Sequence, residues 1–172
     1  RTELTRAIVN PAHLHGVAFE AGLVARILDD VHTEPGQLPL LQFALEMLWA
    51  EQEAGQLTHR AYEGIGKVAG ALARHADGVY HELKLVDQAL ARRIFIQVVR
   101  PGVSTEDTRR LATRAELGDA AWTLVQRLSD SRLLVTNRDD GGNETVEVVN
   151  EELIRDWQRQ QECMQTDREF KI

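Results

Sequence analysis

The sequence has one cysteine, Cys163, so the chain cannot form an internal disulfide, and no Cys/His spacing in it matches a zinc site. A reducing cytoplasm is therefore the simplest compartment to expect. Long hydrophobic runs are missing too, because charge or proline breaks each apolar stretch well short of the roughly 18 residues of a spanning helix. The first residues also lack the apolar core of a signal peptide. Neither membrane insertion nor export is expected.

Basic residues are in the minority. The chain has 20 Lys and Arg against 27 Asp and Glu, which gives a net charge of -7. A field of this sign repels nucleic acid and anionic membranes, so DNA is not expected as a partner. The 172 residues are 43% hydrophobic and 5% aromatic. These values are typical of one or two small soluble globular domains.

Helical spacing dominates the first half of the sequence. Apolar residues recur every four positions over residues 19–32, which predicts an amphipathic helix. Residues 38–53 begin apolar nearly all round, which indicates a central helix buried by its neighbours, with Pro39 in its first turn. Thr58 is expected to cap a short helix, and residues 68–83 form another long helix.

The second half changes character near residue 84. Its order of helix, helix, hairpin and helix is that of a winged-helix module with one extra helix. The predicted fold is therefore mainly α, with a helical bundle domain over residues 1–84 and a winged-helix domain with a C-terminal exit helix over residues 85–172. The predicted elements are a helix at 86–99, a polar loop at 103–113, a helix at 117–130, a β-hairpin of strands 133–136 and 145–149, and a helix from Asn150.

Catalytic motifs are absent from the sequence. No GxxxxGK[ST] loop occurs, and GIGKV at residues 64–68 has the wrong spacing, so it is expected to be a plain turn between helices. Neither Cys163 nor any serine lies in a nucleophile motif. The chain is not expected to be an enzyme by itself.

Three small clusters have simple structural interpretations. The histidines at 13, 15 and 32 are expected to be solvated or at helix ends rather than metal ligands. Asp29 and Asp30 fit a solvated helix end, and Asp139 and Asp140 fit turn chemistry.

Helix 117–130 is the candidate DNA-recognition helix of the winged-helix domain. It is expected to expose Asp119, Gln126, Arg127 and Asp130, a mixture that does not suit a major-groove reader. Protein packing is the favoured use of this module and DNA contact is the alternative. The local basic cluster consists of Arg109, Arg110 and Arg114.

Four runs in this order resemble the region that follows the nucleotide-binding core in bacterial novel STAND NTPases, a family of signal-transduction ATPases often joined to WD repeats. The resemblance covers almost the whole chain, and residues 167–170 (DREF) resemble the family's exit into its sensor region. The four runs are EPGQLPLLQFAL at 34–45, GALARHA at 70–76, GVSTEDTRR at 102–110 and VEVVNEELIRDW at 146–157.

The resemblance implies a division of labour. A P-loop domain upstream binds ATP or ADP with Mg, sensor repeats lie downstream, and this chain corresponds to the helical and winged-helix domains alone. The chain also starts without Met and ends in a helical pattern, so it reads as a piece of a longer protein. No cofactor is expected in this piece itself, and self-association is compatible with it.

The resemblance also implies nucleotide-contacting residues. In relatives the proline matching Pro39 packs near the base, with Gly36 and Leu38 beside it. The residue pattern alone predicts that Pro39 lies at a helix start, and one residue can have both roles. The family histidine that contacts phosphate is replaced by Asn150, which can donate a hydrogen bond but carries no positive charge. Asn150 is alternatively a plain helix N-cap.

The sequence therefore predicts a regulatory segment that couples the nucleotide state of a P-loop domain to a sensor. Two alternatives stay open: a winged-helix DNA-binding regulator, and an interaction scaffold with no nucleotide role.

Overall fold

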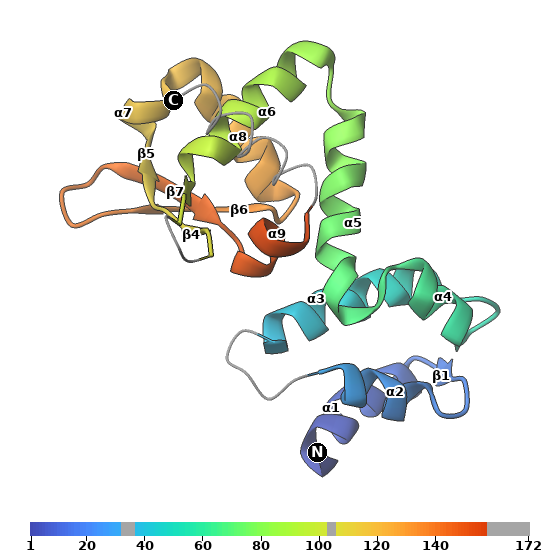
Figure 1. Ribbon diagram of the computed structural model, residues 1–172. Coiled ribbons are helices and arrows are strands. Elements are labelled where there is room, and N and C mark those ends of the chain that lie inside the picture. Colours follow the sequence, from blue (N-terminus) through green and yellow to red (C-terminus); the bar gives the residue numbers. More distant parts are fainter. Residues whose placement is uncertain (32–36, 103–105, 158–172) are drawn as a thin grey trace. The chain divides into compact units, whose positions relative to one another are not determined.

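The computed structural model describes residues 1–31, 37–102 and 106–157, and most of these residues are helical, as predicted (Figure 1). The chain divides into two compact units, Arg1–Arg74 and His75–Ile172. The division falls inside helix α5 (Lys67–Glu82), ten residues before the domain limit expected after residue 84. The naming of the two domains as helical and winged-helix stays a prediction.

The N-terminal unit is built from helices joined by one minimal parallel strand pair. Strand β1 pairs with β2 in a register that places Ala18 opposite Gln56 and Phe19 opposite Leu57. The elements are α1 (Thr2–Leu14), β1 (Ala18–Phe19), α2 (Leu23–Asp30), α3 (Gln37–Ala50), β2 (Gln56–Leu57), α4 (His59–Gly64) and the start of α5.

Two expectations for this unit need correction. The helix predicted over residues 19–32 begins only at Leu23, because Phe19 belongs to β1 and Gly22 adopts a left-handed φ of 79° before the helix. Helix α1 was not predicted; Pro11, a residue that is uncommon inside helices, lies within it.

Helix α3 follows the predicted limits to within a few residues but is not buried all round. Leu40, Leu41, Ala44 and Leu48 face the core, whereas Leu38 is 62% exposed. The expectation of a central helix is therefore wrong: α3 is buried along one face, and part of its apolar surface lines an open groove.

The C-terminal unit combines helices with a three-stranded antiparallel sheet in the order β5-β7-β6. A separate two-stranded pair joins β3 and β4. After α5, the elements are α6 (Leu85–Gln97), β3 (Val99–Arg100), β4 (Thr108–Arg109), β5 (Ala112–Thr113), α7 (Arg114–Leu117), α8 (Asp119–Asp130), β6 (Leu134–Arg138), β7 (Glu144–Val148) and α9 (Glu151–Asp156).

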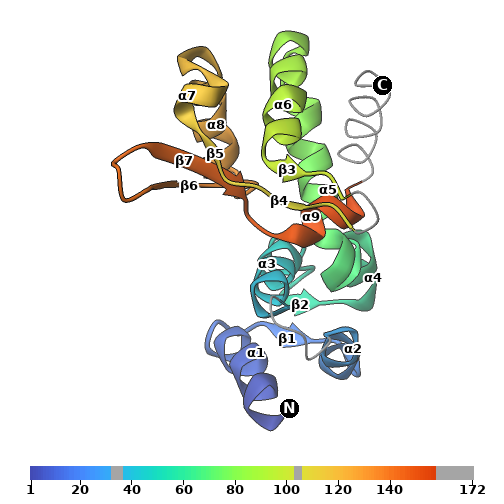
Figure 2. The ribbon, with the colours of Figure 1, turned by 60° about the vertical axis from the view of Figure 1, so that its left-hand side comes forward.

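The predicted β-hairpin is confirmed as β6 and β7, which project together from the unit (Figure 2). The segment expected to be a loop over residues 103–113 contains the short strands β4 and β5 where it is described, because β4 pairs with the nearby β3 and β5 pairs with the distant β7. The helix expected over 117–130 is α8, which begins only at Asp119, because Gly118 with its φ of 86° separates it from α7.

Aromatic side chains close the core of the C-terminal unit. The Trp157 ring meets Phe95 edge-on at 5.0 Å between centroids and Tyr80 at 6.3 Å. The indole Nε1 of Trp157 donates a hydrogen bond to Asp77 at 2.8 Å, so a buried polar group is satisfied. Across the described residues, no helix combines the length and apolar character needed to cross a bilayer.

Candidate functional site

The residues predicted to contact a nucleotide from the N-terminal unit lie at the start of α3. Gly36 falls outside the described residues, whereas Leu38 and Pro39 lie in the first turn of the helix and are exposed. The helix-start role of Pro39 is confirmed, because its missing N–H is not needed in the first turn. Its role toward a nucleotide stays a prediction.

Beside this turn lies an apolar groove of about 470 Å³ within the N-terminal unit. Helix α1 forms one wall and α3 the other, and Gln42 and Glu46 are its polar lining residues. Such a lining can hold an apolar side chain or ring but offers little acid–base chemistry. The apolar lining includes Leu4, Ile8, Pro11, Phe19, Leu38, Leu41, Leu45, Trp49 and Leu57.

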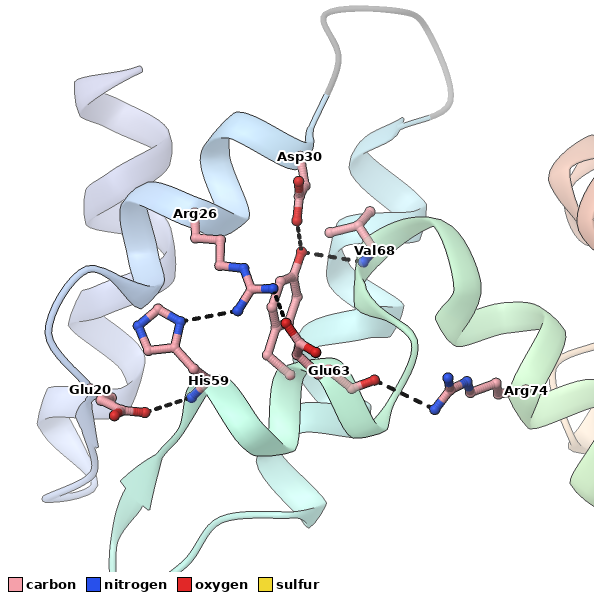
Figure 3. A network of polar contacts seen from close by, with 8 residues as sticks. Glu20, Arg26, Asp30, His59, Glu63, Val68 and Arg74 are labelled. Carbon is pink, nitrogen blue, oxygen red and sulfur yellow. Dashed lines mark hydrogen bonds and ion pairs between the residues drawn. The ribbon is translucent and has the colours of Figure 1, made fainter.

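A polar network on another side of the unit joins α2 to α4 (Figure 3). The guanidinium of Arg26 forms an ion pair with Glu63 and donates to Nδ1 of His59 at 3.2 Å. The Nε2 of His59 faces the carbonyl oxygen of Ala21 at 2.9 Å, so the contacts fit the neutral ring with its proton on Nε2. The backbone N–H of His59 also donates to Glu20 at 2.6 Å.

Arg26 serves two further purposes in this network. Its Cζ lies 5.5 Å from the centre of the Tyr62 ring, a cation–π distance. Its hydrogen bond also lowers the pKa of Glu63, and the charge of Arg26 acts in the same direction. Glu63 therefore stays ionised across the neutral range and holds α4 against α2.

Tyr62 is the buried centre of the network. Its hydroxyl donates to Asp30 at 2.8 Å and accepts from the backbone N–H of Val68 at 3.3 Å. Burial is the main cause of a raised Tyr62 pKa, and the hydrogen bond to Asp30 adds to it, so the phenol remains protonated. One hydroxyl thus joins the end of α2 to the start of α5.

Asn150 is the N-cap of α9. Its side-chain oxygen accepts a hydrogen bond from the backbone N–H of Glu152 at 2.9 Å. The capping interpretation is therefore confirmed, and a contact between Asn150 and phosphate stays a prediction.

The three arginines of the local basic cluster, Arg109, Arg110 and Arg114, face carboxylates. Arg110 contacts Glu116 at 2.6 Å, and Arg114 contacts Glu144 at 2.5 Å and Asp119 at 2.8 Å. Arg109 lies 3.9 Å from Glu147 and 4.0 Å from Glu151. A DNA phosphate would have to compete with these carboxylates for each arginine.

The other clusters behave as structural elements. Helix α8 exposes the four polar residues that were expected on the surface of the recognition helix, namely Asp119, Gln126, Arg127 and Asp130. Asp29 pairs with Arg1, and Asp139 accepts from the backbone N–H of Asn143 at 2.9 Å inside the hairpin turn. Among the residues described, no three His, Cys, Asp or Glu side chains gather as a metal site, and His32 lies outside that set.

Sequence reasoning found the Thr58 cap, which the structure confirms, but missed the network around it. Thr58 accepts from the backbone N–H of Ala61 at 3.0 Å. Arg26 and Glu63 are 37 positions apart, and Tyr62 and Asp30 are 32 apart. No local sequence pattern predicts such pairs, because only the folded chain brings these residues together.

Together these features define a mainly helical protein of two units. The polar clusters described above connect helices and strands of the same unit to one another. Comparison with protein families is more specific: the family described as Novel STAND NTPase 1 matches residues 1–172, the whole chain. The chain belongs to the Novel STAND NTPase 1 family. Searches of curated proteins and of solved structures give no match.

Proposed function

We propose that this chain is the regulatory part of a STAND-type signal-transduction ATPase and couples the nucleotide state of a P-loop domain to a sensor. The observation that carries the proposal is the family match over residues 1–172 in a sequence that has no GxxxxGK[ST] loop. A chain of this family without the phosphate-binding loop is suited to transmitting a nucleotide-dependent change rather than to catalysis. The P-loop domain and sensor repeats are the proposed intramolecular partners.

The order of elements in the C-terminal unit supports a winged-helix role for it. Helix α6 and the short strands β3 and β4 are followed by β5, α7, α8 and the hairpin of β6 and β7, and β5 pairs with the second hairpin strand. A helix pair followed by a hairpin that pairs with an earlier strand is the arrangement expected of a winged helix. The exposed face of α8 suits packing against protein better than reading DNA.

Nucleotide contacts are proposed at two places. Leu38 and Pro39 in the first turn of α3, and Gly36 before it in the sequence, are proposed to contact the base. The apolar groove beside the turn supports this, because bases pack on apolar surfaces. Asn150 is proposed to donate through its amide to phosphate while its oxygen caps α9. In the parent protein ATP or ADP would bind with Mg.

Binding measurements test the proposal. This chain alone is expected to show no ATPase activity and no micromolar affinity for ATP or ADP by titration calorimetry, whereas a longer protein that includes the P-loop domain binds. Micromolar binding by this chain alone would contradict the proposal. So would failure of the folded longer protein to bind either nucleotide.

Substitutions in the longer protein test the two contacts. Pro39→Ala should weaken ADP binding about tenfold, and Pro101→Ala, at another exposed proline, is the matched control. Asn150→Asp keeps a good N-cap but places a negative charge near phosphate, so it should weaken binding without lowering stability. Unchanged affinity in Asn150→Asp would show that Asn150 only caps the helix.

A nucleotide-independent scaffold is the second candidate, and the capping bond of Asn150 favours it because one side-chain polar atom is already used. The scaffold predicts a longer protein that binds neither ATP nor ADP. A mobility shift with random duplex DNA at low salt tests the DNA-binding alternative, for which no shift is expected.

A further inference from the structure

The turn between α4 and α5 has an unusual backbone. Gly66 has a φ of 90° and Lys67, the first residue of α5, has a φ of 60°. A positive φ is uncommon for a residue with a side chain and costs free energy, so it persists only where surrounding contacts hold it. Two such residues in succession set the direction in which α5 leaves α4.

Space at this turn is restricted as well. A Cβ added to Gly66 would lie 3.0 Å from Nε of Arg74 and 3.0 Å from the backbone carbon of Gly70. Glycine is therefore needed here both for its φ and for the close approach of α5.

Tyr62 holds the turn from the side of α2. Val68 is buried, and its backbone N–H lies in the first turn of α5, where N–H groups have no partner within the helix. The Tyr62 hydroxyl accepts from this N–H at 3.3 Å and donates to Asp30 at 2.8 Å. The chain Asp30, Tyr62, Val68 therefore fastens the start of α5 to the end of α2.

Arg74 holds the turn from the side of α5. Its Nη1 donates to the carbonyl oxygen of Gly64, the last residue of α4, and lies 3.5 Å from that of Glu63. Tyr62 thus acts on Val68 at one end of the strained turn, and Arg74 acts on Gly64 at the other.

We propose that the α4–α5 turn, residues 65–68, is a hinge with two positions, and that Tyr62 and Arg74 lock it in the position seen here. In the released position Lys67 leaves its positive φ, the Val68 N–H leaves Tyr62, and α5 takes another direction relative to α4. The regulatory use of the hinge rests on the proposed function, whereas the existence of the hinge is independent of that function.

Spin-label distances across the turn test the proposal in the 172-residue chain. Labels are placed on Arg60→Cys in α4 and Ala73→Cys in α5, two positions that are not buried and lie within the N-terminal unit, with Cys163→Ser to remove the native thiol. One narrow distance distribution is expected without further change. Tyr62→Phe and Arg74→Ala should each add a second distance, and Gly66→Ala should shift the larger share of molecules to it.

Added to Tyr62→Phe, Lys67→Gly should lower the share of molecules at the second distance, because glycine adopts the left-handed φ without a steric penalty. Tyr80→Phe is the matched control: it removes the hydroxyl that accepts from Arg92 at 2.9 Å, away from the turn, and should leave the distances unchanged. Amide exchange at Val68 should rise about fivefold to tenfold in Tyr62→Phe, the change expected for one lost hydrogen bond.

A single unchanged distance in folded Tyr62→Phe and Arg74→Ala would overturn the hinge, even if Gly66→Ala failed to fold. No nucleotide enters this measurement. The distances are therefore expected to stay the same even if the proposed nucleotide function is wrong. Likewise, the result of the nucleotide assay does not depend on whether the hinge exists.

Discussion

The two units differ in how deeply they bury their tryptophan side chains. In the N-terminal unit Trp49 is 36% exposed and lines the apolar groove, whereas in the C-terminal unit Trp122 is 3% and Trp157 2% exposed. A large aromatic ring contributes most to stability when it is fully buried. The C-terminal unit thus buries both of its tryptophans, and the N-terminal unit keeps part of its tryptophan open beside the turn that carries Pro39.

Paired tryptophan substitutions test this comparison with the largest expected effect. Trp157→Ala should lower the free energy of unfolding of the C-terminal unit by about 3–5 kcal/mol, because it removes a buried ring and its hydrogen bond to Asp77. Trp49→Ala should cost clearly less, because Trp49 is only partly buried. Denaturant unfolding with amide exchange resolved by unit provides the measurement, and equal costs for the two variants would break the comparison.

Helix caps should have intermediate and similar effects in the two units. Thr58 caps α4, and Thr113 forms a capping box with Glu116 at α7. Replacing either threonine by alanine should cost about 1 kcal/mol, with the loss confined to its own unit. Thr→Ser at each site keeps the hydroxyl and is the control, so a serine variant as unstable as the alanine variant would contradict the capping account.

Acid sensitivity is the smallest expected effect, since the groups are exposed. The hydrogen bond from Arg26 lowers the pKa of Glu63, and the hydrogen bond from the Thr113 backbone, followed by that from Arg110, lowers the pKa of Glu116. The unfolded state therefore takes up protons first as the pH falls. The contribution of each group is full above the ordinary glutamate pKa of 4.5 and is lost as the pH falls through the lowered value.

Glu63→Gln should accordingly flatten the dependence of stability on pH below about pH 5 in the N-terminal unit, and Glu116→Gln should do so in the C-terminal unit. Unfolding at a series of pH values provides the measurement. An unchanged slope in both variants would show that other carboxylates govern acid unfolding.

Much of the fold could be predicted because its signals are local. Apolar spacing located α3, α5 and α6 to within a few residues, and β-rich runs around a polar turn located the hairpin. Spacing failed where a partner distant in sequence decides the structure. Phe19 fits the helical period of α2 but pairs with Leu57 in a strand, and Ala112 and Thr113 form β5 because β7 lies beside them.

The site could be predicted less well, for the same reason. The cap by Asn150 and the first-turn place of Pro39 follow from local residue preferences and are confirmed. Tyr62 gave no signal, since its function depends on Asp30 and Val68 meeting at one hydroxyl. The GIGKV segment is the turn between helices that was expected, but its positive φ values at Gly66 and Lys67 emerge only from the backbone.

The regulatory role is tested most directly by the nucleotide that the longer protein retains. That protein, with its P-loop domain, is purified without added nucleotide and denatured, and the released material is identified by chromatography. The account predicts about one ADP or ATP per folded chain, with less retained by Asn150→Asp. A folded protein that releases no nucleotide and binds none when it is supplied would contradict the account and favour the scaffold.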